Sequence, residues 1–320
     1  MLHSRTSVIN LAILLVLAVA GAATTVSAAC APDGPADAPV ALVFSGGGAK
    51  GAWEAGVAAA LIEGGVPVRV VAGSSSGALN AVMIADGRIE RLESLWRSLT
   101  REQVYSLRPS VFFAGLLPGW LTAVTLSHTT SLLDPAPLRE LLSTVLDLDR
   151  VRASPTRLVV VTTDLARREP RSFDNQTISL DALVATVAVP GLFPPVEVGG
   201  ASLVDGGLVA RAPILEALDS GVAVRRAIVA LSSAPAERPD PPTRLRDVLE
   251  SAFETLMIHQ IRRDAELARL RHRIDVQVIE PSAPLLLRPL DFDPAALGEA
   301  LARGRADGAR CLGSWSPPPN

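Results

Sequence analysis

Short apolar runs separated by longer, partly polar stretches recur along the chain from residue 40 onward. The runs stand at 40–44, 68–72, 157–162, 202–204, 226–231 and 274–279. Most of them do not alternate between apolar and polar positions, as a strand with one solvent-facing side does. Helices are predicted over 49–61, from about 77, and over 243–271. We therefore predict an α/β fold, a three-layer α/β/α sandwich around a mostly parallel central sheet.

The first thirty residues have the pattern of an export signal. Arg5 supplies a positive charge, residues 11–23 are small or apolar, and Ser27-Ala28-Ala29 presents the small residues that a signal peptidase reads. We interpret residues 1–29 as a secretory signal peptide, which is short for a stable membrane span; an uncleaved anchor is the alternative. The mature protein is then expected in the periplasm, at the outer membrane, or secreted.

Cys30 follows the small residues directly, as in the cleavage box of a bacterial lipoprotein, and lipidation of Cys30 would anchor the protein. However, Ser27 stands where such boxes usually carry an aliphatic residue. The alternative is a plain exported protein in which Cys30 pairs with Cys311, the only other cysteine.

The overall composition is that of a globular protein. Of 320 residues, 48% are hydrophobic and 20% are charged, which excludes a disordered chain or a small disulfide scaffold. A net charge of −3 leaves no electrostatic footprint for nucleic acid, so no such partner is expected. We predict a linker over 30–38, one folded domain over 39–313, and a disordered Pro-rich tail over 314–320.

A glycine-rich loop, Ser45-Gly46-Gly47-Gly48-Ala49-Lys50-Gly51, joins the first predicted strand to the first predicted helix. Its backbone N–H groups suit an anion, either a phosphate or the oxyanion of an acyl-transfer intermediate. A dinucleotide site needs an acidic residue at the end of the second strand, and Val71-Ala72-Gly73-Ser74 supplies none. A P-loop needs Ser or Thr after the lysine, and Gly51 stands there. A tight turn without a ligand is the remaining alternative.

The second predicted strand runs into Gly73-Ser74-Ser75-Ser76-Gly77, which fits the GxSxG pattern of a nucleophile elbow. The central serine of such a turn is exposed on a strained strand-to-helix corner, so Ser75 is the candidate nucleophile. A serine nucleophile also needs a base. The four histidines, His3, His128, His259 and His272, lack the loop context of a triad histidine.

Asp205 is the candidate base, because it ends the 202–204 run and precedes two glycines. A carboxylate within hydrogen-bond reach of Ser75, in a partly dry cleft, can accept its proton directly. An ordinary Asp-Gly turn is the alternative. Asp164 is a second candidate, to which we assign a structural role.

Together these residues resemble the patatin-like phospholipase family over roughly 40–212. The glycine loop is similar to that family's oxyanion loop, Gly73–Gly77 to its nucleophile elbow, and Asp205-Gly206-Gly207 to the motif with its catalytic aspartate. The segment 188–196 resembles a stretch that these proteins have shortly before the aspartate. The chain departs from the family at Ala210-Arg211-Ala212-Pro213, where members often carry an Asn-Pro pair.

The resemblance implies an exported bacterial serine lipid acyl hydrolase of phospholipase A or lysophospholipase type. Asp205 would take the Ser75 proton, and an acyl-enzyme would form and be cleared by water. Gly73 and Gly77 would shape the elbow. The oxyanion hole would come from the loop residues Gly46, Gly47, Gly48, Lys50 and Gly51. Lys50, the only lysine in the chain, is expected to support the loop backbone by hydrogen bonds.

No cofactor or metal is implied by the resemblance, and the expected partners are a phospholipid or lysophospholipid substrate and a membrane surface. Two other functions stay open: an acyltransferase with the same dyad, and a non-catalytic lipid-binding envelope protein. A fluorophosphonate probe separates the enzymes from the binding protein, because both enzymes need an activated serine.

Two further stretches have candidate roles at a membrane. Residues 111–121 form the densest aromatic cluster and predict a lid or acyl-binding flap, with core packing as the alternative. An arginine-rich stretch suits anionic head groups, or else is a solvated helix face with ion pairs to Asp264 and Glu266. Its members are Arg262, Arg263, Arg269, Arg271 and Arg273.

Overall fold

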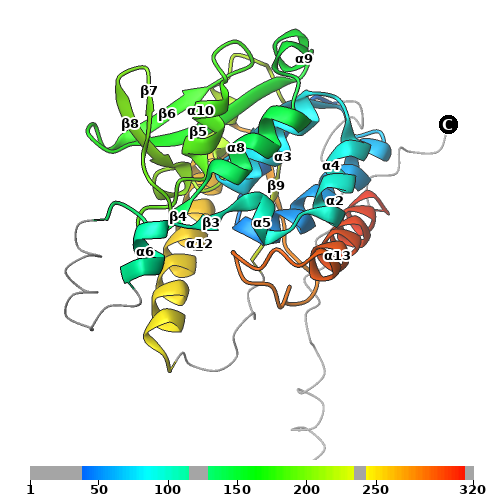
Figure 1. Ribbon diagram of the computed structural model, residues 1–320. Helices are drawn as coiled ribbons and strands as arrows, with labels where there is room; N and C mark the ends of the chain where they lie inside the picture. Colours follow the sequence, from blue (N-terminus) through cyan, green and yellow to red (C-terminus); the bar gives the residue numbers. More distant parts are fainter. Residues whose placement is uncertain (1–37, 115–128, 234–242, 314–320) are drawn as a thin grey trace, which may run out of the picture.

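Figure 1 shows the computed structural model of the protein, which describes residues 38–114, 129–233 and 243–313. The predictions for the signal peptide, Cys30, most of the linker, the C-terminal tail and the 115–121 part of the aromatic stretch therefore lie outside the described residues. No helix within the described ranges is long and apolar enough to span a membrane.

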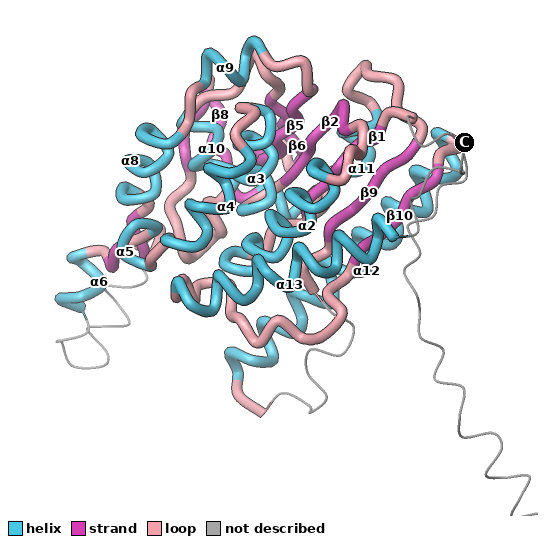
Figure 2. The backbone as a smooth tube through the Cα atoms, turned by 90° about the vertical axis from the view of Figure 1, so that its right-hand side faces the viewer, coloured by secondary structure: helices cyan, strands magenta, loops and turns pink. Residues whose placement is uncertain are grey.

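An eight-stranded sheet of order β10-β9-β1-β2-β5-β8-β7, with β6 paired to β5, forms the centre of the fold. Its strands are β1 (Val40–Phe44), β2 (Val68–Gly73), β5 (Arg157–Asp164), β6 (Glu169–Phe173), β7 (Val196–Val198), β8 (Ala201–Asp205), β9 (Arg226–Ala230) and β10 (Asp275–Ile279). Strands β5, β2, β1, β9 and β10 run parallel, side by side in Figure 2, and confirm the mostly parallel sheet. Strands β6, β7 and β8 form the antiparallel part.

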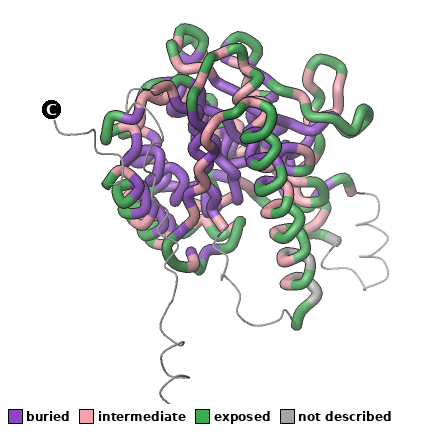
Figure 3. Tube along the Cα trace, turned by 180° about the vertical axis from the view of Figure 1, so that it is seen from behind, coloured by how far each residue is buried: buried purple, intermediate pink, exposed green. Residues whose placement is uncertain are grey.

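Helices cover both faces of the sheet. All of β1 is therefore buried, and its side chains alternate between two apolar cores. The first core contains side chains of α2 (Gly51–Glu63), α3 (Ser76–Ala85), α4 (Ile89–Ser98), α8 (Ala136–Val145), α9 (Leu148–Ala153), α10 (Leu180–Thr186) and α13 (Pro294–Gly313). The second contains side chains of α11 (Ile214–Leu218) and α12 (Leu245–His272). Figure 3 shows the buried centre and the exposed outer side of the helices. The predicted α/β/α sandwich is confirmed.

Short elements complete the chain around one end of the sheet. They are η1 (Gly48–Lys50), α5 (Arg101–Val104), β3 (Ser106–Leu107), α6 (Pro109–Ala114), β4 (Leu133–Asp134) and η2 (Gly206–Leu208). The first predicted helix thus begins as a 3-10 turn and becomes α-helical at Gly51, because the loop before it bends sharply at positive φ.

Helices α2 and α13 cross in close contact. A Cβ on Gly56 would lie 2.1 Å from Leu301 O, and one on Gly304 would lie 2.0 Å from Trp53 O. The indole of Trp53 donates to Asp307 Oδ2 at 2.7 Å across the same contact. The absence of a side chain at Gly56 is therefore required by a second helix, α13, that the apolar pattern did not predict.

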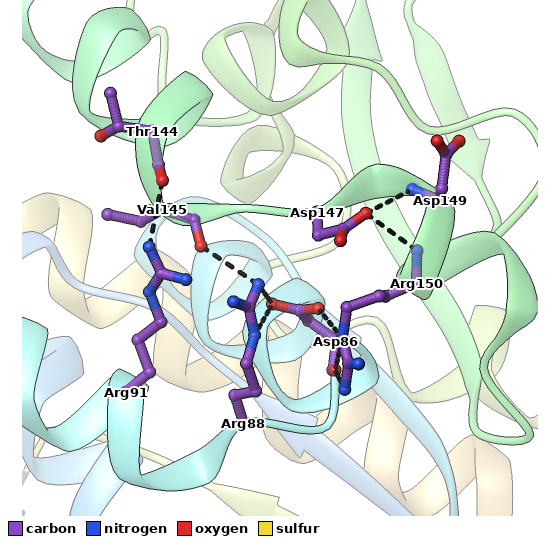
Figure 4. Close-up of polar contacts among 8 residues, drawn as sticks. All are labelled: Asp86, Arg88, Arg91, Thr144, Val145, Asp147, Asp149 and Arg150. Atoms are coloured by element: carbon purple, nitrogen blue, oxygen red, sulfur yellow. Dashed lines mark hydrogen bonds and ion pairs between the residues drawn. The ribbon is translucent and has the colours of Figure 1, made fainter.

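The C-terminal end of α3 is held by a buried carboxylate (Figure 4). Asp86 Oδ1 accepts from Arg150 Nε at 3.0 Å, and Oδ2 accepts from Arg88 Nε at 2.8 Å. The Asp86 side chain is fully buried, and Arg150 Nη2 also donates to its carbonyl at 3.1 Å. This clamp joins the end of α3 to α9 and so fixes the helix that follows the predicted nucleophile.

Candidate active site

Ser75 lies between β2 and α3 in a backbone conformation that serine seldom adopts, with φ 54° and ψ −137°. The turn is possible because both flanking glycines approach other backbone atoms. A Cβ on Gly73 would lie 2.3 Å from Gly77 C, and one on Gly77 would lie 2.8 Å from Gly46 N. Such strain at a strand-to-helix corner is the geometry of a nucleophile elbow.

The Ser75 backbone is held by Thr186 of α10. Ser75 N–H donates to Thr186 Oγ1 at 3.1 Å, and that hydroxyl donates to Val161 O of β5 at 2.6 Å. Thr186 is fully buried. No motif pointed to this threonine, because its role depends on the packing of α10 against β5.

Strand β8 brings Asp205 to the elbow. It pairs antiparallel with Thr162–Asp164, beyond the part of β5 that pairs with β2. At its end, a Cβ on Gly206 would lie 3.2 Å from Ser74 Cβ. Asp205, the last residue of β8, therefore lies beside the start of α3, although 130 positions separate it from Ser75 in the sequence.

The Asp205 carboxyl is buried and incompletely paired. Oδ1 accepts from Gly207 N–H at 2.7 Å, whereas Oδ2 makes no hydrogen bond of standard geometry among the described residues. Burial raises the pKa of Asp205, and the charge of Arg211, the Gly207 N–H and the nearby Ser75 hydroxyl lower it. The Ser75 hydroxyl thus lies close enough to act on the Asp205 carboxyl, and both residues line the same cavity.

The glycine loop closes over the same site. Gly48 has φ 63°, and a Cβ there would lie 1.9 Å from Pro289 O. Ala49 N–H donates to that carbonyl at 2.9 Å, so the segment around Pro289 fixes the loop from outside. Lys50 is buried, and its Nζ lies 3.2 Å from Glu254 Oε1 of α12. This ion pair connects the loop to α12.

The loop residues divide into two groups. Within the described part of the chain, the cavity is lined by Gly47, Gly48 and Lys50 but not by Gly46 or Gly51. A Cβ on Gly51 would lie 2.9 Å from both Ser76 Oγ and Trp96 Cζ2, which gives this glycine a packing role.

Glu54 is a buried carboxyl behind the glycine loop, in the first turn of α2. It accepts from Ser45 Oγ at 2.8 Å, and its Oε2 has no hydrogen-bond partner among the described residues. Burial raises the pKa of Glu54 to about 7, against lowering effects of the Ser45 hydroxyl and the Arg211 charge. The sequence alone did not identify Glu54, because it is a single polar position among the mostly small residues of the predicted helix.

Ser75 and Asp205 line a cavity of about 640 Å³ whose surface is mostly apolar. Its walls come from α3, α4, α5, α8, α12 and several loops, among them residues 187–193 and 288–292. Apolar lining residues include Leu79, Met83, Leu95, Leu138, Leu141, Val187, Leu192, Phe253, Met257, Ile258, Leu290 and Phe292. A cavity of this size and lining, with few polar groups, suits a hydrocarbon chain.

The other candidate residues lie elsewhere. Asp164 Oδ1 accepts from Ala166 N and Arg167 N at 3.0 Å, which closes the β5–β6 turn. His259 is exposed, and His272 Nε2 lies 3.5 Å from Asp219 Oδ1. His128 lies outside the described residues. In the described ranges, no three His, Cys, Asp or Glu side chains are grouped as metal ligands.

The two candidate membrane stretches have exposed side chains. Phe112 and Phe113 of α6 are 56% and 63% exposed, so the core-packing alternative is wrong for them. The arginine-rich stretch is exposed on and after α12, with ion pairs from Arg263 to Asp264 at 3.4 Å and from Arg269 to Glu266 at 3.6 Å. This is the geometry of a solvated helix face.

The model of the family described as patatin-like phospholipase matches residues 42–218, more than half of the chain. The chain belongs to this family, as the motifs predicted. An uncharacterised NTE family protein of Mycobacterium tuberculosis is 32% identical over 177 residues, which cover 55% of this chain and 44% of that protein. The chain therefore spans less than half the length of this relative. YqhO of Bacillus subtilis is 28% identical over 236 residues, 67% of this chain and 79% of that protein.

Two solved structures are similar at low sequence identity. VipD from Legionella pneumophila has a TM-score of 0.45 and 16% identity, covering 88% of this chain and 67% of that one. The type III effector protein ExoU has a TM-score of 0.39 and 17% identity, covering 89% and 54%.

Proposed function

We propose that this protein is a serine lipid acyl hydrolase of phospholipase A or lysophospholipase type, with Ser75 as nucleophile and Asp205 as base. The observation that carries the proposal is the strained φ of Ser75, held beside a buried carboxyl in an apolar cavity. Strain of this kind persists only where the surrounding structure imposes it, and it is concentrated at reactive sites. Membership of the patatin-like phospholipase family supports the same assignment.

The reaction follows from the positions of these groups. The Asp205 carboxylate takes the proton of the Ser75 hydroxyl as Ser75 Oγ attacks the acyl carbonyl. Backbone N–H groups of Gly47 and Gly48 hydrogen-bond the oxyanion of the tetrahedral intermediate. The leaving alcohol then takes the proton from Asp205. Water attacks the acyl-enzyme, Asp205 again accepts a proton, and the fatty acid leaves as Ser75 is reprotonated.

The cavity supports a long-chain acyl substrate. Transfer of each methylene from water to an apolar wall contributes about 0.8 kcal/mol. Leu79 and Met83 of α3 continue along the wall from the elbow, on the helix that Ser75 begins. A chain bound along this wall would place its carbonyl carbon beside the nucleophile.

We further propose that the cavity opens toward a membrane surface in an exported protein. Tyr105 Oη donates to Leu290 O at 3.2 Å, and Leu132 N–H donates to Gly191 O at 3.1 Å, so the segments flanking α6 are fixed to the cavity rim. Of the exposed apolar side chains, Leu208 and Phe253 line the cavity, and Leu107, Phe112, Phe113 and Leu256 lie on β3, α6 and α12. Figures 1 and 2 show α6 and the N-terminal half of α12 in the same lower half of the molecule.

Two variants test the dyad. Ser75→Ala and Asp205→Asn should each lower fatty-acid release from phospholipid vesicles by about 10³-fold or more, because nucleophile and base act as a unit. Asp164→Asn is the matched control, since that carboxyl closes a turn and should retain the wild-type rate. Fluorophosphonate labelling of the wild type, lost in Ser75→Ala, identifies the nucleophile.

The outcomes separate the three functions. Unchanged release in both dyad variants would contradict the dyad. Ester product in place of fatty acid, when an alcohol acceptor is added, would favour an acyltransferase. An unlabelled wild type would favour a lipid-binding protein.

A further inference from the structure

The carbonyl of Gly46 is held by two side chains from outside the glycine loop. Arg211 Nη2 donates to Gly46 O at 3.1 Å, and Ser232 Oγ donates to the same oxygen at 2.6 Å. Ser232 follows β9, and Arg211 follows the Asp205 turn. Three separate segments of the chain therefore meet at one peptide group.

This peptide group carries the N–H of Gly47. The described chain has no cis peptide bond, so Gly46 C=O and Gly47 N–H point to opposite sides of one planar unit. Donors that fix the direction of the carbonyl therefore also fix the direction of the N–H. Gly47 lines the cavity with Ser75, and Gly46 is outside the lining within the described residues. The Gly47 N–H points away from both donors, and Gly47 and Arg211 both line the cavity.

We propose that Arg211 is a positioning residue for the hydrolysis: its guanidinium holds and polarises the Gly46–Gly47 peptide, so that Gly47 N–H is a fixed and stronger donor to the oxyanion. This inference rests on the proposed function. A charged donor on a carbonyl strengthens the hydrogen bond that the same peptide donates on its other side. A donor fixed before the reaction needs no reorganisation when charge develops on the substrate.

Arg211 also connects this peptide to the base. A Cβ on Gly47 would lie 3.3 Å from Arg211 Nη2, and one on Gly207 would lie 3.3 Å from Nη1. The guanidinium therefore spans the space between the glycine loop and the Asp205 turn. Its positive charge lowers the pKa of Asp205 against the effect of burial. One side chain thus supports both the oxyanion donor and the ionised base.

This arginine stands in the segment where the chain departs from its family. Members often carry an Asn-Pro pair shortly after the aspartate motif, and this chain has Arg211 and Pro213.

The pH dependence of activity reports on this charge. Asp205 must be ionised to accept a proton, so activity rises with pH through the pKa of Asp205. Loss of the Arg211 charge raises that pKa, and the acid limb of the kcat/KM profile should then move to higher pH. Other charged or titratable groups at or behind the site are Glu54 of α2, Lys50 of η1, Glu254 of α12, and Arg288 and Asp291 of the segment after β10.

The experiment measures kcat and KM for a water-soluble p-nitrophenyl ester across pH in Arg211→Gln and Arg211→Lys. Arg211→Gln should lower kcat about tenfold or more with KM within about twofold of the wild type, and should move the acid limb to higher pH. Arg211→Lys retains the charge and should restore the wild-type limb. Arg171→Gln, a half-buried arginine over the Phe173 ring, is the matched control and should change neither quantity.

Ser232→Ala separates the hydrogen bond from the charge. It removes the other donor to Gly46 O from outside the loop, while Ser45 Oγ still donates to that oxygen at 3.2 Å, so kcat should fall severalfold while the acid limb stays in place. Glu54→Gln shows whether Glu54 contributes to the limb, because the amide does not titrate. Circular dichroism of each variant checks the fold; if Arg211→Gln does not fold, Arg211→Ala takes its place, and wild-type kcat with an unmoved acid limb in that variant overturns the proposal.

The wild type distinguishes the two proposals. A wild type that neither hydrolyses the ester nor reacts with the fluorophosphonate overturns the proposed function. A wild type that hydrolyses the ester, with a folded Arg211→Gln of unchanged kcat and unchanged acid limb, overturns only the role of Arg211.

Discussion

At the scale of single residues, the site is a set of buried groups whose charge states depend on one another. Glu54 lies under the glycine loop with one oxygen unpaired, and Asp205 lies at the elbow with one oxygen unpaired. Arg211 acts electrostatically on both carboxyls. Burial opposes ionisation of each carboxyl, and the charge of Arg211 favours it, so the charge state of each carboxyl depends on these two opposing effects.

Glu54 should make the protein less stable as pH rises. Its pKa is about 7 in the folded protein against 4.5 for a free glutamate side chain, so the folded state retains a proton that the unfolded state releases. The contribution of Glu54 to the free energy of unfolding is therefore fully present below about pH 4.5 and is lost as pH rises through about 7, by roughly 3 kcal/mol.

Glu54→Gln does not titrate, so its free energy of unfolding relative to the wild type should increase between pH 5 and pH 8. Urea denaturation at both pH values measures the change, with Glu140→Gln on the exposed surface of α8 as control. An equal difference between the two proteins at both pH values would show that Glu54 is ionised throughout.

The residues that sequence alone identified are those with a local signature. Ser75 is flanked by glycines that the turn requires, and Asp205 is followed by two more. Thr186, Arg211 and Ser232 have no such signature, because each acts through a contact between segments far apart in the chain. Lys50 was identified by its place in the loop, but its ion-pair partner Glu254 depends on how α12 packs.

At the scale of elements, the contact between α2 and α13 supports the site from behind. Helix α2 begins directly after the glycine loop, and Trp53 in its first turn bonds Asp307 of α13. Movement of α2 along α13 would therefore move the loop. The glycines at the crossing keep the two helix axes close.

Gly304→Ala should destabilise the protein by about 2 kcal/mol, because its Cβ would lie 2.0 Å from Trp53 O, and overpacking exceeds the gain in helix propensity. Gly298→Ala is the control on the same helix. Nothing lies within 4 Å of its new Cβ, so it should stabilise the protein by up to about 1 kcal/mol. Thermal unfolding of both variants checks the difference, and equal effects would contradict the close crossing.

Elements with a strong local apolar pattern were predicted well. Elements whose position or direction depends on the helix or strand that they pack against were not. Every residue of the run Val40–Phe44 is apolar, as in a strand buried on both faces, and the structure has β1 at the same residues. Helix α13 was missed because its buried residues are mostly small and are interspersed with arginines. The antiparallel direction of β8 was also missed, since a three-residue run does not reveal which strand edge it joins.

At the scale of the whole molecule, the cavity combines two parts of the chain. The elbow, the aspartate and the glycine loop lie within residues 42–218, which the family model matches. Phe253, Met257, Ile258 and the residues around Pro289 lie beyond it and form the other wall. Sequence resemblance therefore predicted the candidate dyad, while much of the cavity wall became apparent only in the structure.

Contact with a membrane should depend on the exposed phenylalanines of α6. Replacing Phe112 and Phe113 together by serine should lower hydrolysis of phospholipid vesicles by about tenfold or more, since exposed apolar area drives interfacial binding. Hydrolysis of a water-soluble short-chain ester should be unchanged. Leu165→Ser, at a similarly exposed apolar residue of the β5–β6 turn, should affect neither substrate. Equal losses on both substrates would place the phenylalanines in the fold and not at a membrane.

The two sources of the cavity have an evolutionary consequence. Mutations in α12 or near Pro289 can change the shape of the cavity without replacing Ser75 or Asp205, so substrate preference can diverge while the proposed dyad is kept. Pro289 is an exception, because its carbonyl accepts a hydrogen bond from Ala49 N–H and lies against Gly48 in the glycine loop. Selection for a new substrate at that position would act at the same time on the rate of the reaction.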